Sequence, residues 1–81
     1  MSRIESRSAR FKDLLLTIAR TDGYWRARVE EVGDPSSTLS DGTDYPSPDR
    51  AKKGAGAIAR DLFGTNVSED QLEWREAKEL T

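Results

Sequence analysis

The side chains that could do chemistry in this chain are carboxylates, hydroxyls and the cationic ends of arginine and lysine. There is neither histidine nor cysteine, which excludes the usual zinc sites and any Ser-His or Cys-His relay. Asp34, Asp41, Asp44 and Asp49 cluster in one segment rich in Gly, Ser and Pro. Their spacing does not fit an EF-hand loop, whereas aspartate in such surroundings is typical of turns. We therefore expect no metal site, no cofactor and no enzymatic activity.

One group of side chains has the character of a protein-binding surface. Arg26 and Arg28 alternate along the polar side of a predicted strand, and Tyr24 precedes them at the same spacing. Arg20 lies just before the preceding turn, and Trp74 falls outside the apolar stripe of its own predicted helix. Arginine and aromatic side chains are frequent anchors in protein interfaces. We predict that these residues contact a protein partner; the alternatives are pairing of the arginines with nearby glutamates and a place for Trp74 at the core edge.

A second group would suit a nucleic acid. Arg50, Lys52 and Lys53 lie at the start of a predicted helix, where cationic side chains can contact phosphates. With Arg26 and Arg28 they form the alternative prediction, a small nucleic-acid-binding domain. A solvated helix face is the simpler interpretation of the lysines, and a global nucleic-acid binder is normally basic overall.

The composition limits the size and class of the protein. The chain has 81 residues, 35% hydrophobic and 35% charged, with a formal net charge of −2. This is one small domain with a thin core, so formation of a homodimer would add useful buried surface. Residues 1–28 hold seven basic and three acidic side chains, whereas residues 29–49 hold six acidic and no basic ones. With no long apolar run and no apolar leader, we expect a cytoplasmic protein that does not contact membranes.

The first half of the chain has the alternation of half-buried strands. A strand is predicted to begin near Phe11, and residues 24–32 alternate cleanly between apolar and charged positions. Asp22-Gly23 between them suits the positive φ angles of a tight hairpin. Residues 33–37 are predicted as a loop, and residues 38–40 as a short third strand.

The N-terminal segment allows two interpretations. Residues 1–10 are polar and are predicted as an arm that precedes a single domain of residues 11–81. Helical spacing of Ile4, Phe11 and Leu15 keeps a helix over residues 3–16 as the alternative. That alternative has the α-β-β-β-α layout of a double-stranded-RNA-binding domain.

The second half is predicted to be helical. Ser47 can cap a helix that begins at Pro48 and that Gly64 closes. Gly54 and Gly56 inside this helix each cost about 1 kcal/mol against alanine, which close approach of the helix to the sheet would offset. A second helix is predicted over residues 67–80, beginning with a capping box.

These elements predict an α+β fold: a three-stranded antiparallel sheet with the Ala-rich helix packed on one face and a C-terminal helix beside it. The predicted core consists of apolar side chains from the two longer strands and the first helix: Leu14, Leu16, Ile18, Trp25, Ala27, Val29, Ile58 and Leu62.

The pattern of residues 13–63 resembles the HicB-type antitoxin domain. The matching stretches are residues 22–29, residues 40–43 and the helical positions Ala51, Ala55, Ile58 and Leu62. The resemblance implies a partial RNase H-like unit without catalytic residues, which binds and neutralises a small toxin ribonuclease and often oligomerises. The chain departs from that pattern at residues 33–37, which lack the usual Pro-Gly-Cys-like corner.

We therefore predict a non-enzymatic protein-binding module that inhibits its partner, as an antitoxin or a phage-encoded blocker of host machinery would.

Overall fold

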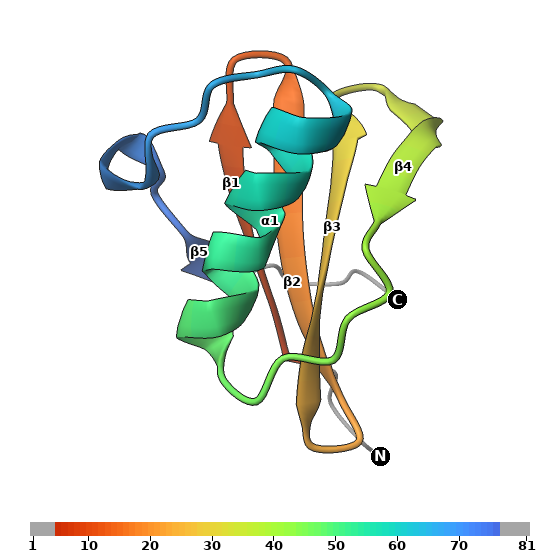
Figure 1. Ribbon diagram of the computed structural model, residues 1–81, viewed down its shortest axis with the longest axis vertical. Coiled ribbons are helices and arrows are strands. Elements are labelled where there is room, and N and C mark those ends of the chain that lie inside the picture. Colours follow the sequence, from red (N-terminus) through yellow and green to blue (C-terminus); the bar gives the residue numbers. More distant parts are fainter. Residues whose placement is uncertain (1–4, 77–81) are drawn as a thin grey trace.

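In the described part of the chain, a five-stranded antiparallel sheet with one α-helix on one face forms the fold (Figure 1). The computed structural model describes residues 5–76. The strand order in the sheet is β4-β3-β2-β1-β5, so the first four strands form consecutive hairpins and β5 joins the outer edge of β1. The elements are β1 (Ser6–Phe11), β2 (Leu14–Thr21), β3 (Tyr24–Glu31), β4 (Asp34–Ser40), α1 (Pro48–Leu62), the 3-10 helix η1 (Glu69–Gln71) and β5 (Arg75–Glu76).

The central hairpin of β2 and β3 confirms the sequence prediction. Asp22 and Gly23 both have positive φ angles, 53° and 87°, as a tight two-residue hairpin requires. Trp25, Ala27 and Val29 are buried, whereas the side chains between them point away from the core. This strict alternation fixes which face of β3 meets the helix.

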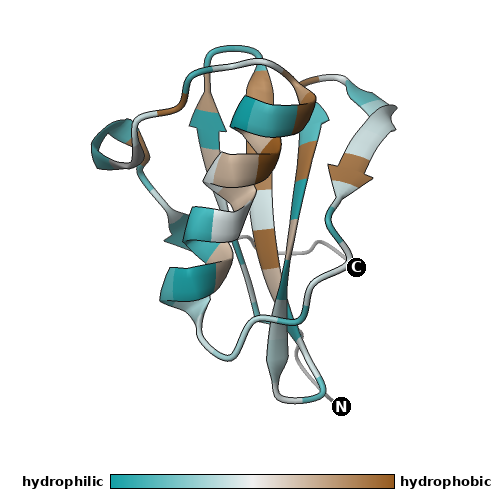
Figure 2. Ribbon diagram, in the orientation of Figure 1, coloured by the Kyte–Doolittle hydropathy of each residue, from teal (hydrophilic) through white to brown (hydrophobic). Residues whose placement is uncertain are grey.

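Helix α1 packs on that apolar face, and Figure 2 shows hydrophobic positions both in the helix and in the strands behind it. The Ser47 hydroxyl accepts a hydrogen bond from the Arg50 amide at 3.3 Å, and Pro48 opens the helix. Beyond the helix Gly64 has a φ of +68°. The start and end of this helix are therefore as predicted.

Seven of the eight predicted core residues are buried, and Leu62 is not. Leu62 is 54% exposed, although it lies at the inward angle of the helix. Leu62 is the last residue of α1, and the next residue, Phe63, packs against the core instead. Ala51, Ala55 and Ala59 complete the helix side of the core.

The prediction of a three-stranded sheet is wrong, and the N-terminal strand is one reason. Within the described residues, Ser6–Arg10 are part of β1 rather than of an arm or a helix. Ala9 is buried, and Arg7 places its guanidinium 5.7 Å from the centre of the Trp25 ring. This part of the strand was not predicted, because its inward positions carry a small residue and an arginine rather than large apolar side chains.

Strand β4 begins at Asp34, within the segment predicted as a loop. Side-chain hydroxyls support this polar strand: Ser37 accepts from the Glu31 amide at 2.7 Å, and Ser40 donates to the Ala27 carbonyl at 2.9 Å. Pairing with β3 therefore overrides the weak strand propensity of these residues.

The predicted C-terminal helix is wrong over its described part. Residues 69–71 form a single 3-10 turn, closed by the Gln71 amide on the Ser68 carbonyl at 3.0 Å. Arg75 and Glu76 then pair with Ser8 and Arg7. Pairing with the free edge of β1 wins over the capping box, because an unpaired edge offers hydrogen-bonding partners. Residues 77–80 of that prediction lie outside the described residues.

The segment between β4 and α1 is fixed by Tyr45, which exchanges two backbone hydrogen bonds with Trp25, at 2.8 and 2.7 Å. The Tyr45 hydroxyl donates to Asp41. A Cβ at Gly54 would overlap the Tyr45 ring, whereas one at Gly56 would meet nothing within 4 Å. The close approach predicted for these glycines is therefore made at Gly54 alone, and to Tyr45 rather than to the sheet.

Candidate interaction surface

The face of the sheet opposite α1 carries a set of arginines that we call the arginine face: Arg10, Arg26, Arg28 and Arg75. The register places Arg28 opposite Thr17, Thr17 opposite Ser8 and Ser8 opposite Arg75, so one row crosses four strands. Tyr24, 53% exposed, continues the β3 row beside Arg26. Ser8 and Thr17 lie between Arg75 and Arg28, whereas Leu15 lies beside Arg10 and Glu30 follows Arg28 on this face. The helix lies only on the other face (Figure 1).

The arginines of this face differ in how far they are already neutralised. Arg26 Nε donates to Asp44 Oδ1 at 2.8 Å. This hydrogen bond and the charge of Asp44 raise the pKa of Arg26 further above its ordinary value. Within residues 5–76, Arg75 pairs only with its sequence neighbour Glu73, at 3.3 Å, and Arg10 donates to the Lys12 carbonyl at 3.4 Å. Arg28 has neither an ion-pair partner nor a side-chain hydrogen bond in this part of the chain. Arg28 is therefore the cation most free to bind an external carboxylate.

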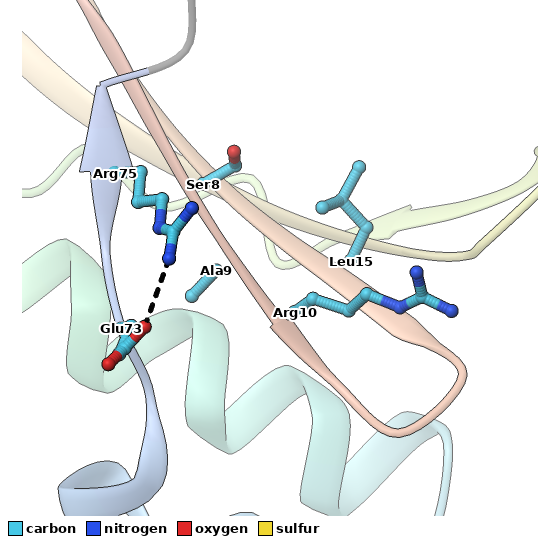
Figure 3. A pocket seen from close by; sticks show the side chains of 6 residues that line it. All are labelled: Ser8, Ala9, Arg10, Leu15, Glu73 and Arg75. Carbon is cyan, nitrogen blue, oxygen red and sulfur yellow. Dashed lines mark hydrogen bonds and ion pairs between the residues drawn. The ribbon is translucent and has the colours of Figure 1, made fainter.

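A shallow hollow of about 260 Å³ lies at the β1–β5 edge of the arginine face (Figure 3). Its lining includes Ser8, Leu15, Arg10 and Arg75. Figure 3 shows that Arg75 turns toward Glu73, while Arg10 extends past Leu15 and away from Arg75. The two guanidinium groups therefore do not converge on one small anion, and the hollow belongs to a broad surface.

The structure brings together three of the five residues predicted to bind a protein. Tyr24, Arg26 and Arg28 point to the same side of β3. Arg20 lies opposite Trp25, on the helix side, and pairs with Glu5 at 3.6 Å. Trp74 is half-buried against the core, at the edge where the sequence allowed it, so Arg20 and Trp74 are separate from the arginine face.

The residues predicted to bind nucleic acid are divided between two faces of the fold. Arg26 and Arg28 lie on the sheet, whereas Arg50, Lys52 and Lys53 lie on α1, which covers the opposite side. Lys52 also places its ammonium 5.9 Å from the centre of the Trp74 ring. A single nucleic-acid backbone could not contact all five on one flat surface.

Arg10 and Arg75 were not among the predicted site residues, because each lies in a strand that the sequence did not predict. The alternation of Arg10 with Ala9 was the available signal for Arg10. Nothing local marked Arg75, since its place depends on pairing with β1, which is distant in sequence.

The aspartates serve local structure. Asp34 accepts from the Ser36 amide at 3.2 Å, Asp41 from the Thr43 amide at 2.9 Å, and Asp44 from Arg26. Asp49 lies in the first turn of α1, where its negative charge interacts favourably with the positive end of the helix dipole. Across residues 5–76, no three acidic side chains are grouped to hold a metal ion.

In the described part of the chain, no helix has the length and apolar character needed to cross a bilayer. Comparison with known proteins gives no match: no family model fits the sequence, and no curated protein or solved structure is significantly similar to it.

Proposed function

We propose that this chain is a non-enzymatic protein-binding module that takes an acidic surface of a partner protein on its arginine face. The observation that carries the proposal is the exposed row of Tyr24, Arg26 and Arg28 on a sheet face that the helix leaves free. A flat sheet face with an aromatic side chain and planar guanidinium groups suits a protein surface rich in carboxylates.

The surrounding charge favours a compact acidic partner over a nucleic acid. Arg75 and Arg28 are three strand spacings apart, about 14 Å, so the cationic area is small. Residues 29–49 hold six acidic and no basic side chains, and Glu30 among them lies on the arginine face, two positions beyond Arg28 on β3. A long polyanion that ran along β3 would meet the carboxylate of Glu30, whereas a local acidic patch over Tyr24, Arg26 and Arg28 would not.

The proposal includes inhibition, since a rigid sheet placed over a partner's acidic surface excludes other ligands from it. The resemblance to the HicB-type antitoxin domain motivates the proposed inhibition, and the inhibited partner would be a toxin ribonuclease or a host protein. We place the module in the cytoplasm, because a chain without cysteine gains nothing from an oxidising compartment.

The test uses a photo-crosslinking amino acid in place of Tyr24, with the same group in place of Arg60 on the helix as the control. The partner captured from position 24 is identified, purified and titrated against the wild type by calorimetry. We expect Arg28→Glu to weaken binding at least about tenfold, added salt to weaken it further, and Arg60→Glu to leave it unchanged.

Two results would overturn the proposal. One is equal crosslinking from positions 24 and 60, which would show that the arginine face is not the contact. The other is a crosslinked product that nuclease removes, together with a mobility shift of nucleic acid by the purified chain.

A further inference from the structure

A groove separate from the arginine face lies where the segment before α1 meets the first turns of the helix. Its volume is about 510 Å³. Tyr45 and Pro46 form one side, and Gly54 and Ala57 contribute the helix side. Because these groups expose little polar surface, the groove offers contact to an apolar side chain.

The rim of this groove carries cations that nothing in the described structure neutralises. Arg50 and Lys53 lie one helical turn apart, both are exposed, and neither has an acidic partner within residues 5–76. Asp44 also lines the groove, but its carboxylate is held by Arg26 at 2.8 Å. The local charge is therefore positive, and a carboxylate would find partners on the helix side.

We propose that this groove is a second binding site, which takes a peptide segment with a bulky apolar side chain directly beside a carboxylate. The apolar side chain lies on Tyr45, Pro46 and Ala57, and the carboxylate reaches Arg50 and Lys53. The charge of the rim selects against basic and neutral segments, and the apolar floor selects against segments that carry charge alone. A phosphate backbone would use the two cations and leave the floor empty.

The test is a titration followed by amide chemical shifts of the isotope-labelled full chain. The probe is the blocked pentapeptide Ser-Phe-Glu-Glu-Ser, and its matched controls are Ser-Phe-Gln-Gln-Ser and Ser-Ala-Glu-Glu-Ser. We expect saturable shifts at the amides of Thr43, Gly54 and Ala57. Each control peptide should bind at least about fivefold more weakly, because each lacks one of the two recognised groups.

Variants of the chain separate this site from the arginine face. Arg50→Gln with Lys53→Gln should weaken the probe about tenfold, whereas Arg60→Gln, which removes a cation from the same helix, should not. Arg28→Glu should leave probe binding unchanged, so the two proposals can fail independently. A thermal melt shows whether each variant is folded.

Three outcomes would overturn the inference. They are the absence of saturable shifts at about 1 mM probe, shifts confined to the amides of β3, and equal loss of affinity in the Arg60→Gln control.

Discussion

The two glycines inside α1 should respond in opposite ways to the same substitution. Gly54 and Gly56 are both buried in the helix, and glycine to alanine in a helix interior gains about 1 kcal/mol. At Gly56 an added Cβ meets nothing within 4 Å. Gly56→Ala should therefore stabilise the fold by about 1 kcal/mol.

At Gly54 the same Cβ would lie 2.8 Å from Tyr45 Cε2 and closer to the hydroxyl end of the ring. The ring cannot withdraw freely, since the Tyr45 backbone is bonded to Trp25 and its hydroxyl to Asp41. Overpacking costs about 1–3 kcal/mol, and a lost hydrogen bond adds about 1 kcal/mol. After the helix gain, Gly54→Ala should be destabilising by about 1–3 kcal/mol.

Thermal and urea unfolding followed by circular dichroism measures both changes. In a domain of this size 1 kcal/mol shifts the Tm by about 4–8 °C, so the two variants should melt well apart, on opposite sides of the wild type. In a Tyr45→Ser background, Gly54→Ala should instead become stabilising, because the ring is gone. A Gly54→Ala variant that melts as high as Gly56→Ala would refute the reasoning.

Three further perturbations test the rest of the packing. Burial raises the pKa of Tyr45, and the hydrogen bond and charge of Asp41 raise it further. The stability that Tyr45 contributes is therefore present below its unfolded pKa of about 10 and is lost as the pH rises through the folded pKa. Urea melts at rising pH should show this decline, and Tyr45→Phe should remove it. Trp25→Ala, at a position 5% exposed, should cost about 3–5 kcal/mol, and an unchanged Tm would contradict its burial. Ile58→Ala should cost about 2–5 kcal/mol, whereas Leu62→Ala should change the unfolding free energy by about 0.5 kcal/mol or less; equal losses would show that the last helical turn is packed.

Local sequence patterns were sufficient to predict an element where one of its faces is buried and its ends carry specific turn or capping residues. The alternation from Trp25 to Val29, the turn at Asp22-Gly23 and the cap at Ser47 each have a local physical cause, and each is present in the structure. Two members of the arginine face could be predicted for the same reason, because they occupy the outward positions of β3.

The edges of the sheet could not be predicted, because long-range pairing decides them. Ser6–Phe11 and Arg75–Glu76 have weak strand propensity, and they form strands because β2 and then β1 offer a free edge. For residues 67–76 the capping box supported a helix, but a helix nucleus is costly and local signals are worth only about 1 kcal/mol. The edge of β1 instead offers unpaired backbone groups to Arg75 and Glu76.

The segregation of charge in the sequence bears on function as well as on folding. Blocks of opposite sign could have neutralised each other, but within residues 5–76 a single ion pair, Arg26–Asp44, joins the basic block of residues 1–28 to the acidic block of residues 29–49. The other pairs join residues of the same block or near neighbours. Because an exposed pair contributes little stability, folding does not account for the arginines that are left on the sheet. The acidic partner that we propose would account for them.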